Sequence, residues 1–129
     1  MNEITEVTRR NIIDVLKIER VNWAGDLDEG AFLSRIFDLN SLKSTDYRFD
    51  NMAQDIWQHR IRNFDWDDGW VYYDERINLL GCGDSLFLQF LCEMIHPIVR
   101  RDIKSVHRLL QMFNTFLKED GYEIVETSE

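Results

Sequence analysis

The sequence predicts a mainly α-helical fold, a compact bundle of about five helices in a single domain that spans residues 1–129. The chain has one proline, Pro97, so long helices are permitted almost everywhere. Apolar residues recur at the i, i+3, i+4 spacing of buried helix faces in five segments. The composition, 44% hydrophobic and 12% aromatic, supplies enough apolar surface for the core of one domain.

The first two expected helices lie in the N-terminal third of the chain. The first spans residues 8–20, with Thr8 as its N-cap. Its apolar face consists of Ile12, Val15, Leu16 and Ile18. The second begins near Asp28, which is a good capping residue, and buries Phe32, Leu33, Ile36 and Phe37. The polar residues 40–47 that follow predict a loop.

The third expected helix begins after Asp50 and is the helix that leads into the most unusual segment of the chain. Its apolar residues at helical spacing are Ala53, Ile56, Trp57, Ile61 and Phe64. Residues 65–70, which read Asp-Trp-Asp-Asp-Gly-Trp, end it. Residues 70–73, Trp-Val-Tyr-Tyr, have the composition of a short strand.

The fourth and fifth helices are predicted most strongly. Gly81-Cys82-Gly83 forms a turn, after which Asp84 caps a helix that ends or kinks at Pro97. Its apolar stripe consists of Leu86, Phe87, Phe90, Leu91, Met94 and Ile95, and Cys92 in this run is expected to be a buried thiol. The fifth helix starts after Asp102. Its predicted buried face is Ile103, Val106, Leu110, Phe113 and Leu117.

Residues 122–126 resemble a short terminal strand in composition. One strand is not stable alone. We therefore expect it to pair with residues 70–73, as a short two-stranded β piece beside the bundle, or with a strand of another chain or domain.

The net charge of the chain disfavours some classes of binding partner. The net charge is −9, from 24 acidic and 15 basic residues, so phosphate backbones and anionic membranes are repelled. A protein partner or a basic ligand fits this surface better, and plain solubility is the alternative explanation. The two cysteines do not form a C-x-x-C pair, and the N-terminus lacks an apolar signal region. These features predict a cytoplasmic protein without a cofactor.

The acidic residues after the third helix do not match a calcium loop. An EF-hand needs glycine at its sixth place and glutamate at its twelfth. Counted from Asp65, those places hold Trp70 and Arg76. We therefore expect an acidic exposed or capping loop and no metal site.

The histidines offer one candidate for catalysis. Arg101 and His107 are separated by five residues, as in the Arg-to-His motif of HEPN ribonucleases, where histidine acts as acid or base and arginine stabilises phosphate charge. The pattern is short, and the acidic chain is a poor match for RNA. Two surface residues on the fifth helix are the favoured interpretation. For His59 and His96, structural roles are favoured.

An ordered series of local motifs covers nearly the whole chain, from about Thr5 to Ser128. They are residues 8–12, TRRNI; 31–39, AFLSRIFDL; 44–49, STDYRF; 55–59, DIWQH; 63–68, NFDWDD; 87–97, FLQFLCEMIHP; 113–117, FNTFL; and 121–126, GYEIVE. This series resembles the third class of AbiJ N-terminal domains, which belong to bacterial abortive-infection and related conflict systems.

The resemblance implies an α-rich module that lies N-terminal to an effector, such as a HEPN or TIR domain, and that senses or assembles rather than cleaves. A protein partner or fused effector domain is therefore expected. The chain ends at Glu129, where relatives of this kind would continue, so it is either an excised domain or a stand-alone version. The resemblance supplies no catalytic residues.

The segment from Trp57 to Trp70 is the candidate site, because it holds three of the four tryptophans with polar side chains between them. Protein interfaces are enriched in such aromatic residues next to polar groups. The candidate residues are Trp57, Gln58, His59, Asn63, Asp65, Trp66, Asp67 and Asp68. They form either an interaction surface or an organising centre, in which the tryptophans are core and the polar groups hold the loop in place.

Overall fold

The computed structural model describes residues 3–126, and almost all regular structure in them is helical. This confirms the predicted fold class. The elements are α1 (Glu6–Ile18), α2 (Glu29–Ser34), α3 (Met52–Ile56), the π-helix η1 (Trp57–Arg62), the 3₁₀-helix η2 (Trp70–Tyr73), α4 (Asp84–Met94), α5 (Ile103–Leu117) and the 3₁₀-helix η3 (Lys118–Asp120).

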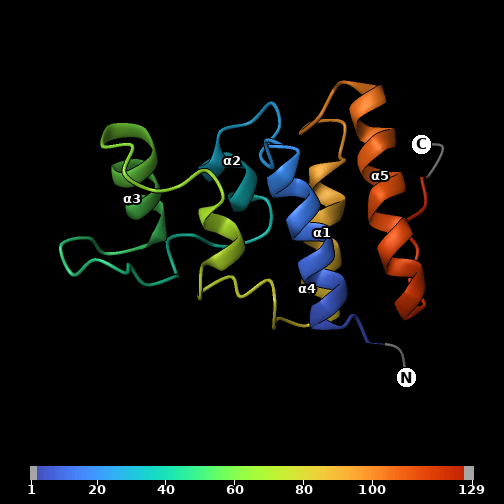
Figure 1. Ribbon diagram of the computed structural model, residues 1–129. Coiled ribbons are helices and arrows are strands. Elements are labelled where there is room, and N and C mark those ends of the chain that lie inside the picture. The colour runs from blue at the N-terminus through green and yellow to red at the C-terminus, as the bar shows by residue number, and fades with distance from the viewer. Residues whose placement is uncertain (1–2, 127–129) are drawn as a thin grey trace.

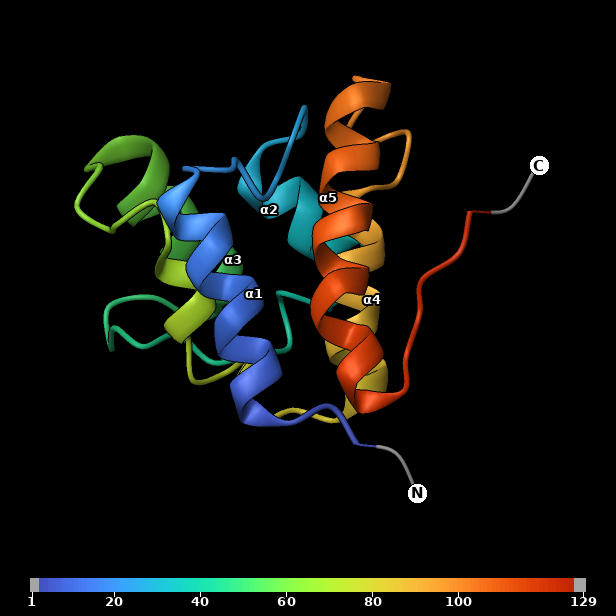
Figure 2. The ribbon, with the colours of Figure 1, turned by 45° about the vertical axis from the view of Figure 1, so that its right-hand side comes forward.

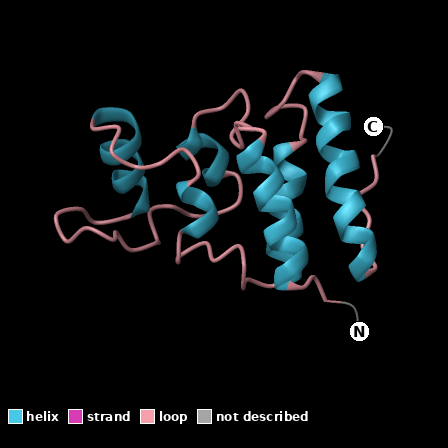
Figure 3. Cartoon of the chain, viewed as in Figure 1, coloured by secondary structure: helices cyan, strands magenta, loops and turns pink. Residues whose placement is uncertain are grey.

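The three long helices lie side by side, and the short elements lie to one side of them. In Figures 1 and 2, α1, α4 and α5 run roughly along one direction, and α1 contacts α5. The other side contains α2, α3, η1 and η2, which are joined by long loops (Figure 3). The candidate segment therefore belongs to the loop-rich side of the molecule.

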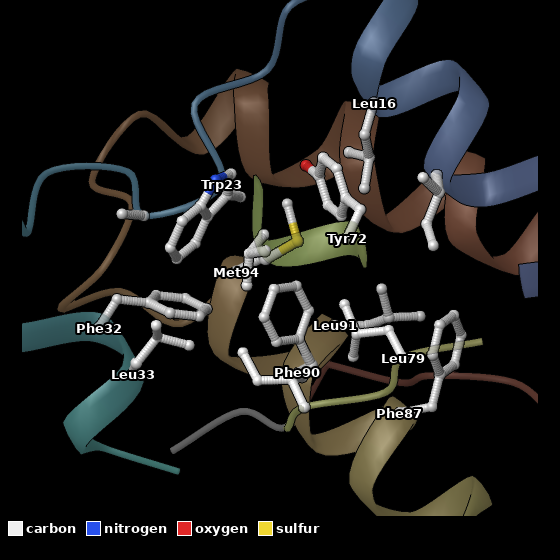
Figure 4. Packing of buried hydrophobic residues seen from close by; sticks show 14 of the residues in the cluster. Leu16, Trp23, Phe32, Leu33, Tyr72, Leu79, Phe87, Phe90, Leu91 and Met94 are labelled. Atoms are coloured by element: carbon white, nitrogen blue, oxygen red, sulfur yellow. The ribbon is translucent and has the colours of Figure 1, made fainter. Parts of the chain in front are cut away.

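One hydrophobic cluster joins the two sides. Figure 4 shows Trp23, Phe32, Tyr72 and Phe90 packed together from four separate segments of the chain. The Phe32 and Phe90 rings meet edge to face with centroids 5.3 Å apart. The predicted stripe of α4 is largely confirmed, since Phe87, Phe90, Leu91 and Met94 are buried and Ile95 is half-buried.

Of the three predicted helix caps, Asp28 is correct and Thr8 and Asp84 are not, whereas the fifth helix starts after Asp102 as expected. Asp28 caps α2, accepting a hydrogen bond from the Ala31 N–H at 2.7 Å, and Asp102 caps α5. By contrast α1 begins earlier than predicted, because Thr5 and not Thr8 is its N-cap, and it ends at Ile18. Gly83 precedes α4 as its N-cap. Asp84 does not cap the helix, since its carboxylate accepts hydrogen bonds from other parts of the chain.

The predicted apolar face of the third helix is wrong beyond its first turn. Asn51 caps α3, and Ile56 is buried as expected, but the helix widens to a π-helix at Trp57. A π-helix has more residues per turn than an α-helix, so α-helical spacing no longer keeps side chains on one face. Trp57, Ile61 and Phe64 are accordingly 52%, 56% and 71% exposed.

Neither predicted strand forms. Residues 70–73 are the 3₁₀-helix η2, which buries Val71 and Tyr72. Residues 122–126 run beside α5 without a ladder partner, and the amide of Asn114 both donates to and accepts from the backbone of Ile124 at 2.8 Å. Within residues 3–126 the only strand-like pairing is a single bridge between Lys43 and Asn51.

Two smaller expectations also change. Cys92 is exposed, because it lies on the outer side of α4, and not buried as its apolar neighbours indicated. Ile103 at the start of α5 is likewise exposed, whereas Val106, Phe113 and Leu117 are buried as predicted. Among the described residues, no helix combines the length and the apolar character that crossing a membrane requires.

Candidate interaction site

The π-helix η1 and the loop after it form a closed turn, here called the π-turn (residues 57–68). The carbonyl of His59 accepts hydrogen bonds from the backbone N–H groups of Asp65, at 3.0 Å, and Trp66, at 3.4 Å. The chain reverses at Phe64, which adopts a left-handed backbone conformation with a φ of 56°. This conformation is unfavourable for a bulky residue, so the surrounding contacts must hold it.

His59 fixes the inner side of the π-turn. Its Nδ1 lies 2.7 Å from a carboxylate oxygen of Asp65, and its ring stacks on Trp66 with centroids 4.7 Å apart and planes 10° apart. Phe49 contacts the same imidazole edge to face at 6.3 Å. His59, Asp65 and Trp66 were all predicted site residues, and the structure brings them together.

Arg60 is the central polar residue of the π-turn, although the sequence does not distinguish it from its polar neighbours. Its guanidinium donates to both carboxylate oxygens of Glu29, at 2.7 and 3.1 Å, to the carbonyl of Trp66 at 2.5 Å and to Asp68 at 2.8 Å. The hydrogen bond with Glu29 is the main reason that the pKa of Arg60 is raised. Because Glu29 is 31 residues away in the chain, no local motif indicates this pairing.

Tryptophans connect the π-turn to the core. Trp66 packs on Trp70 with centroids 4.9 Å apart, and Trp70 contacts the buried Trp23 at 6.0 Å. The Trp70 indole donates to Glu29 at 3.1 Å, and the Trp23 indole donates to the carbonyl of Asp68 at 3.0 Å. Trp66, like His59 and Asp65, therefore makes its contacts within the π-turn and toward the core.

The remaining predicted residues face outward or lie at the edge. Trp57 is exposed and has the guanidinium of Arg62 over its ring at 5.8 Å. Gln58 is half-buried, whereas Asn63, Asp67 and Asp68 are exposed. The Asp68 side chain is 96% exposed even though it pairs with Arg60. Thus three of the eight candidate residues contact one another inside the π-turn, and most of the others are exposed, as are Ile61 and Phe64.

A pocket of about 750 Å³ opens beside the π-turn and is here called the π-turn pocket. It lies between the end of α1, the loop before α2, η1 and η2. Its apolar lining includes Leu16, Trp23, Leu27, Ile56, Ile61, Phe64 and Tyr72. The charged side chains in the lining are Lys17, Arg20, Asp28, Glu29, Arg60, Asp67 and Asp68. The sequence does not indicate this pocket, because its walls come from four separate segments.

A second, buried hydrogen-bond network is centred on Asp55 of α3. The sequence did not indicate it. Asp55 is fully buried and accepts hydrogen bonds from Arg76 Nη1 at 2.8 Å, from the Thr45 N–H at 3.0 Å and from the Ser44 hydroxyl. Asp74 binds the other side of the Arg76 guanidinium at 2.7 Å. This network holds the loop of residues 43–48 against α3. Its hydrogen bonds stabilise the fold and do not point to a reaction.

The two residues of the ribonuclease hypothesis have different partners. Arg101, before α5, donates to Asp26 at 3.2 Å, and its side chain is 84% exposed. His107, on α5, lies 2.9 Å from Glu126. Each therefore contacts an exposed carboxylate of a different segment. His96 accepts a hydrogen bond from the Ile98 N–H after α4, which is a local structural contact.

The chain is thus an α-helical domain with an exposed aromatic surface on the π-turn, beside the half-buried Arg60. A model of the family AbiJ N-terminal domain 3 matches residues 3–129, essentially the whole chain. The chain therefore belongs to this family, which associates it with abortive-infection systems. Searches of curated proteins and of solved structures gave no significant match.

Proposed function

We propose that this chain is a non-catalytic sensing or protein-interaction module of an antiphage abortive-infection system, and that it works with a separate effector domain. Family membership supports the association with abortive infection. The observation that carries the interaction role is the outer surface of the π-turn, where Trp57, Ile61 and Phe64 are all more than half exposed.

The way in which these side chains are held supports a binding role. Placing three large apolar side chains in water loses the stabilisation that their burial would give. The turn also contains a π-helix and a left-handed phenylalanine, two features that cluster at functional sites because they are unfavourable elsewhere. Tryptophan and arginine, paired here as Trp57 and Arg62, are enriched among the residues that dominate binding energy.

The inner residues of the π-turn support the outer ones. Arg60, Glu29, His59 and Trp66 form a half-buried framework, and the Arg60 guanidinium lies 5.6 Å from the ring of the exposed Phe64. A rigid framework lowers the entropy cost of binding, because the contacting groups are already in place. The two hypotheses made for this segment are therefore compatible: one layer organises the turn, and the other layer contacts the partner.

A phage-challenge assay tests the proposal. The gene, with its native genetic neighbours, is placed in a phage-sensitive host, and plaque formation is compared for the wild type, Trp57→Ala and Tyr47→Ala. Tyr47 is the matched control, because it is a 98% exposed aromatic residue outside the π-turn. We expect Trp57→Ala to abolish protection with an unchanged thermal midpoint, and Tyr47→Ala to keep protection.

Two results would contradict the proposal. The first is full protection by Trp57→Ala. The second is RNA cleavage by the purified chain that His107→Ala abolishes without unfolding it, since that would assign the chain to the ribonuclease class.

A further inference from the structure

We infer that the π-turn pocket is the docking site for the partner, and that it receives a large apolar side chain from a basic segment of that partner. This inference rests on the proposed function, and it adds the chemistry of the partner. The other features of the molecule with polar clusters, around Asp55 and around Asp84, are closed by contacts within the chain.

The rim of the pocket has the character of an anchor site. Ile61, Phe64 and Tyr73 line it and are 56%, 71% and 56% exposed. The inner wall includes Leu16, Trp23 and Tyr72, which Figure 4 shows converging from three segments of the chain. These inner residues are 1–3% exposed, so an apolar side chain that enters from solvent would cover mainly the exposed apolar surface of the rim. Burial of such surface in a packed pocket is how interface anchors contribute most of their affinity.

Phe64 links the strain in the turn to the pocket. Its left-handed backbone directs the chain around the rim, and the guanidinium of Arg60 lies 5.6 Å from its ring. Glycine or asparagine adopts this conformation at lower cost. A phenylalanine here is unfavourable for folding but adds aromatic area at the pocket entrance, so its presence is explained by a ligand that uses this area.

The charged side chains that line the pocket indicate which residues of the partner would flank its apolar side chain. Asp67 and Asp68 line the pocket and are exposed; Asp68 pairs with Arg60 at 2.8 Å, and the Asp67 carboxylate interacts electrostatically with Lys17. Of the lining cations, Arg60 is held by Glu29 and Asp68, and Lys17 donates to the Tyr73 hydroxyl and lies over its ring at 4.7 Å. The lining has four carboxylates, Asp28, Glu29, Asp67 and Asp68, against three cations, Lys17, Arg20 and Arg60. Together with the net charge of −9, this excess favours a basic segment and accelerates its approach.

Arg20 is the lining cation that opposes this assignment, and it makes an acidic ligand the alternative to be tested. Three fluorescein-labelled peptides separate the contributions of anchor and charge: KKWKK, KKAKK, which lacks the anchor, and EEWEE, which reverses the charge. Their binding to the full chain is measured by fluorescence anisotropy. We expect saturable binding of KKWKK, with KKAKK and EEWEE each at least about tenfold weaker.

Two isoleucine variants test whether the peptide binds in the π-turn pocket. Ile61→Ala is compared with Ile98→Ala, because the two isoleucines are 56% and 57% exposed and only Ile61 lines the pocket. We expect Ile61→Ala to weaken KKWKK binding about fivefold to tenfold and Ile98→Ala to leave it unchanged. Phe64→Asn should weaken binding similarly without lowering the thermal midpoint, since asparagine tolerates the left-handed backbone.

The outcomes separate this inference from the proposed function. Equal binding of KKWKK and KKAKK, tighter binding of EEWEE, or equal effects of the two isoleucine variants would overturn the pocket assignment. Absence of any peptide binding, combined with loss of phage protection in Trp57→Ala, would overturn the inference and leave the interaction role in place. Peptide binding that is lost in Ile61→Ala, combined with full protection by both Ile61→Ala and Trp57→Ala, would contradict the role in defence instead.

Discussion

Arg60 and Asp68 form an ion pair, but removing one partner should have a different effect from removing the other. The Arg60 side chain is 10% exposed and also binds Glu29 and the carbonyl of Trp66, whereas the Asp68 side chain is almost fully exposed. Exposed ion pairs contribute little to stability, while a half-buried carboxylate that loses its partner is costly. The energetic centre of the π-turn is therefore the arginine.

We predict that Arg60→Ala lowers the free energy of unfolding by about 2 kcal/mol. In a domain of this size, that corresponds to a fall in thermal midpoint of several degrees. Asp67→Ala and Asp68→Ala should leave the midpoint unchanged, because both carboxylates lie in water. Differential scanning calorimetry of the three variants checks this, and a midpoint for Asp68→Ala as low as that for Arg60→Ala would show that the loop carboxylates hold the turn.

The sequence singled out the residues of this turn as a group but did not distinguish Arg60 among them. The tryptophans and acids of residues 57–70 were visible as an unusual local composition, and His59, Asp65 and Trp66 do lie together. Arg60 lies among them without a distinguishing pattern, because its role depends on Glu29 from α2. Contacts between residues far apart in sequence are invisible to periodicity and spacing, and the pocket was missed for the same reason.

The helices differ in how well the sequence specified them. Three of them, α1, α4 and α5, were predicted because each has an apolar stripe several turns long beside polar residues. The third helix has the same spacing of apolar residues, but a change to π geometry at Trp57 rotates the later ones into solvent. Residues 70–73 have strand-forming side chains, yet packing against Trp23 and the core makes them a 3₁₀-helix, since strand preference depends on context.

For α4 we predict a large loss of stability when its central aromatic residue is truncated. Phe90 is 1% exposed and contacts the rings of Phe32 and Trp23, so Phe90→Ala leaves a cavity that its neighbours fill only in part. We expect the free energy of unfolding to fall by roughly 3–5 kcal/mol, measured by urea denaturation. Gln89→Ala, at an exposed position of the same helix, is the control. A loss below about 1 kcal/mol for Phe90→Ala would show that this face is not packed in the monomer.

One carboxylate ties the ends of the three long helices together. Asp84, in the first turn of α4, accepts hydrogen bonds from the Ile4 N–H before α1 at 3.1 Å, from Arg9 on α1 at 3.1 Å and from the Tyr122 hydroxyl after α5 at 2.8 Å. Burial opposes ionisation of this group, but the hydrogen bonds from Tyr122, Ile4 and Arg9 outweigh burial, so the pKa of Asp84 is lowered. The packing of the long helices is thus linked to the charge of a single side chain.

This linkage predicts that acid destabilises the whole molecule in a way that depends on Asp84. Its pKa in the native state lies below the ordinary value of 3.8 that applies after unfolding, so the native state binds fewer protons. The stabilisation is therefore present above pH 3.8 and is lost as the pH falls through the lowered native pKa. Asp84→Asn should have a lower thermal midpoint than the wild type at pH 7, and the difference should shrink as the pH is reduced from 4 to 2.

Calorimetric midpoints measured across that pH range test the linkage, with Asp14→Asn, an exposed carboxylate on α1, as the control. The control should follow the wild type at every pH, because an exposed carboxylate contributes little to folding. If Asp84→Asn instead runs parallel to the wild type down to pH 2, the charge of Asp84 does not stabilise the native state. The hydrogen bonds that join α1, α4 and α5 would then act through their geometry alone, and the acid sensitivity would have to come from other carboxylates with a lowered pKa, such as Asp46 with its pKa of about 2.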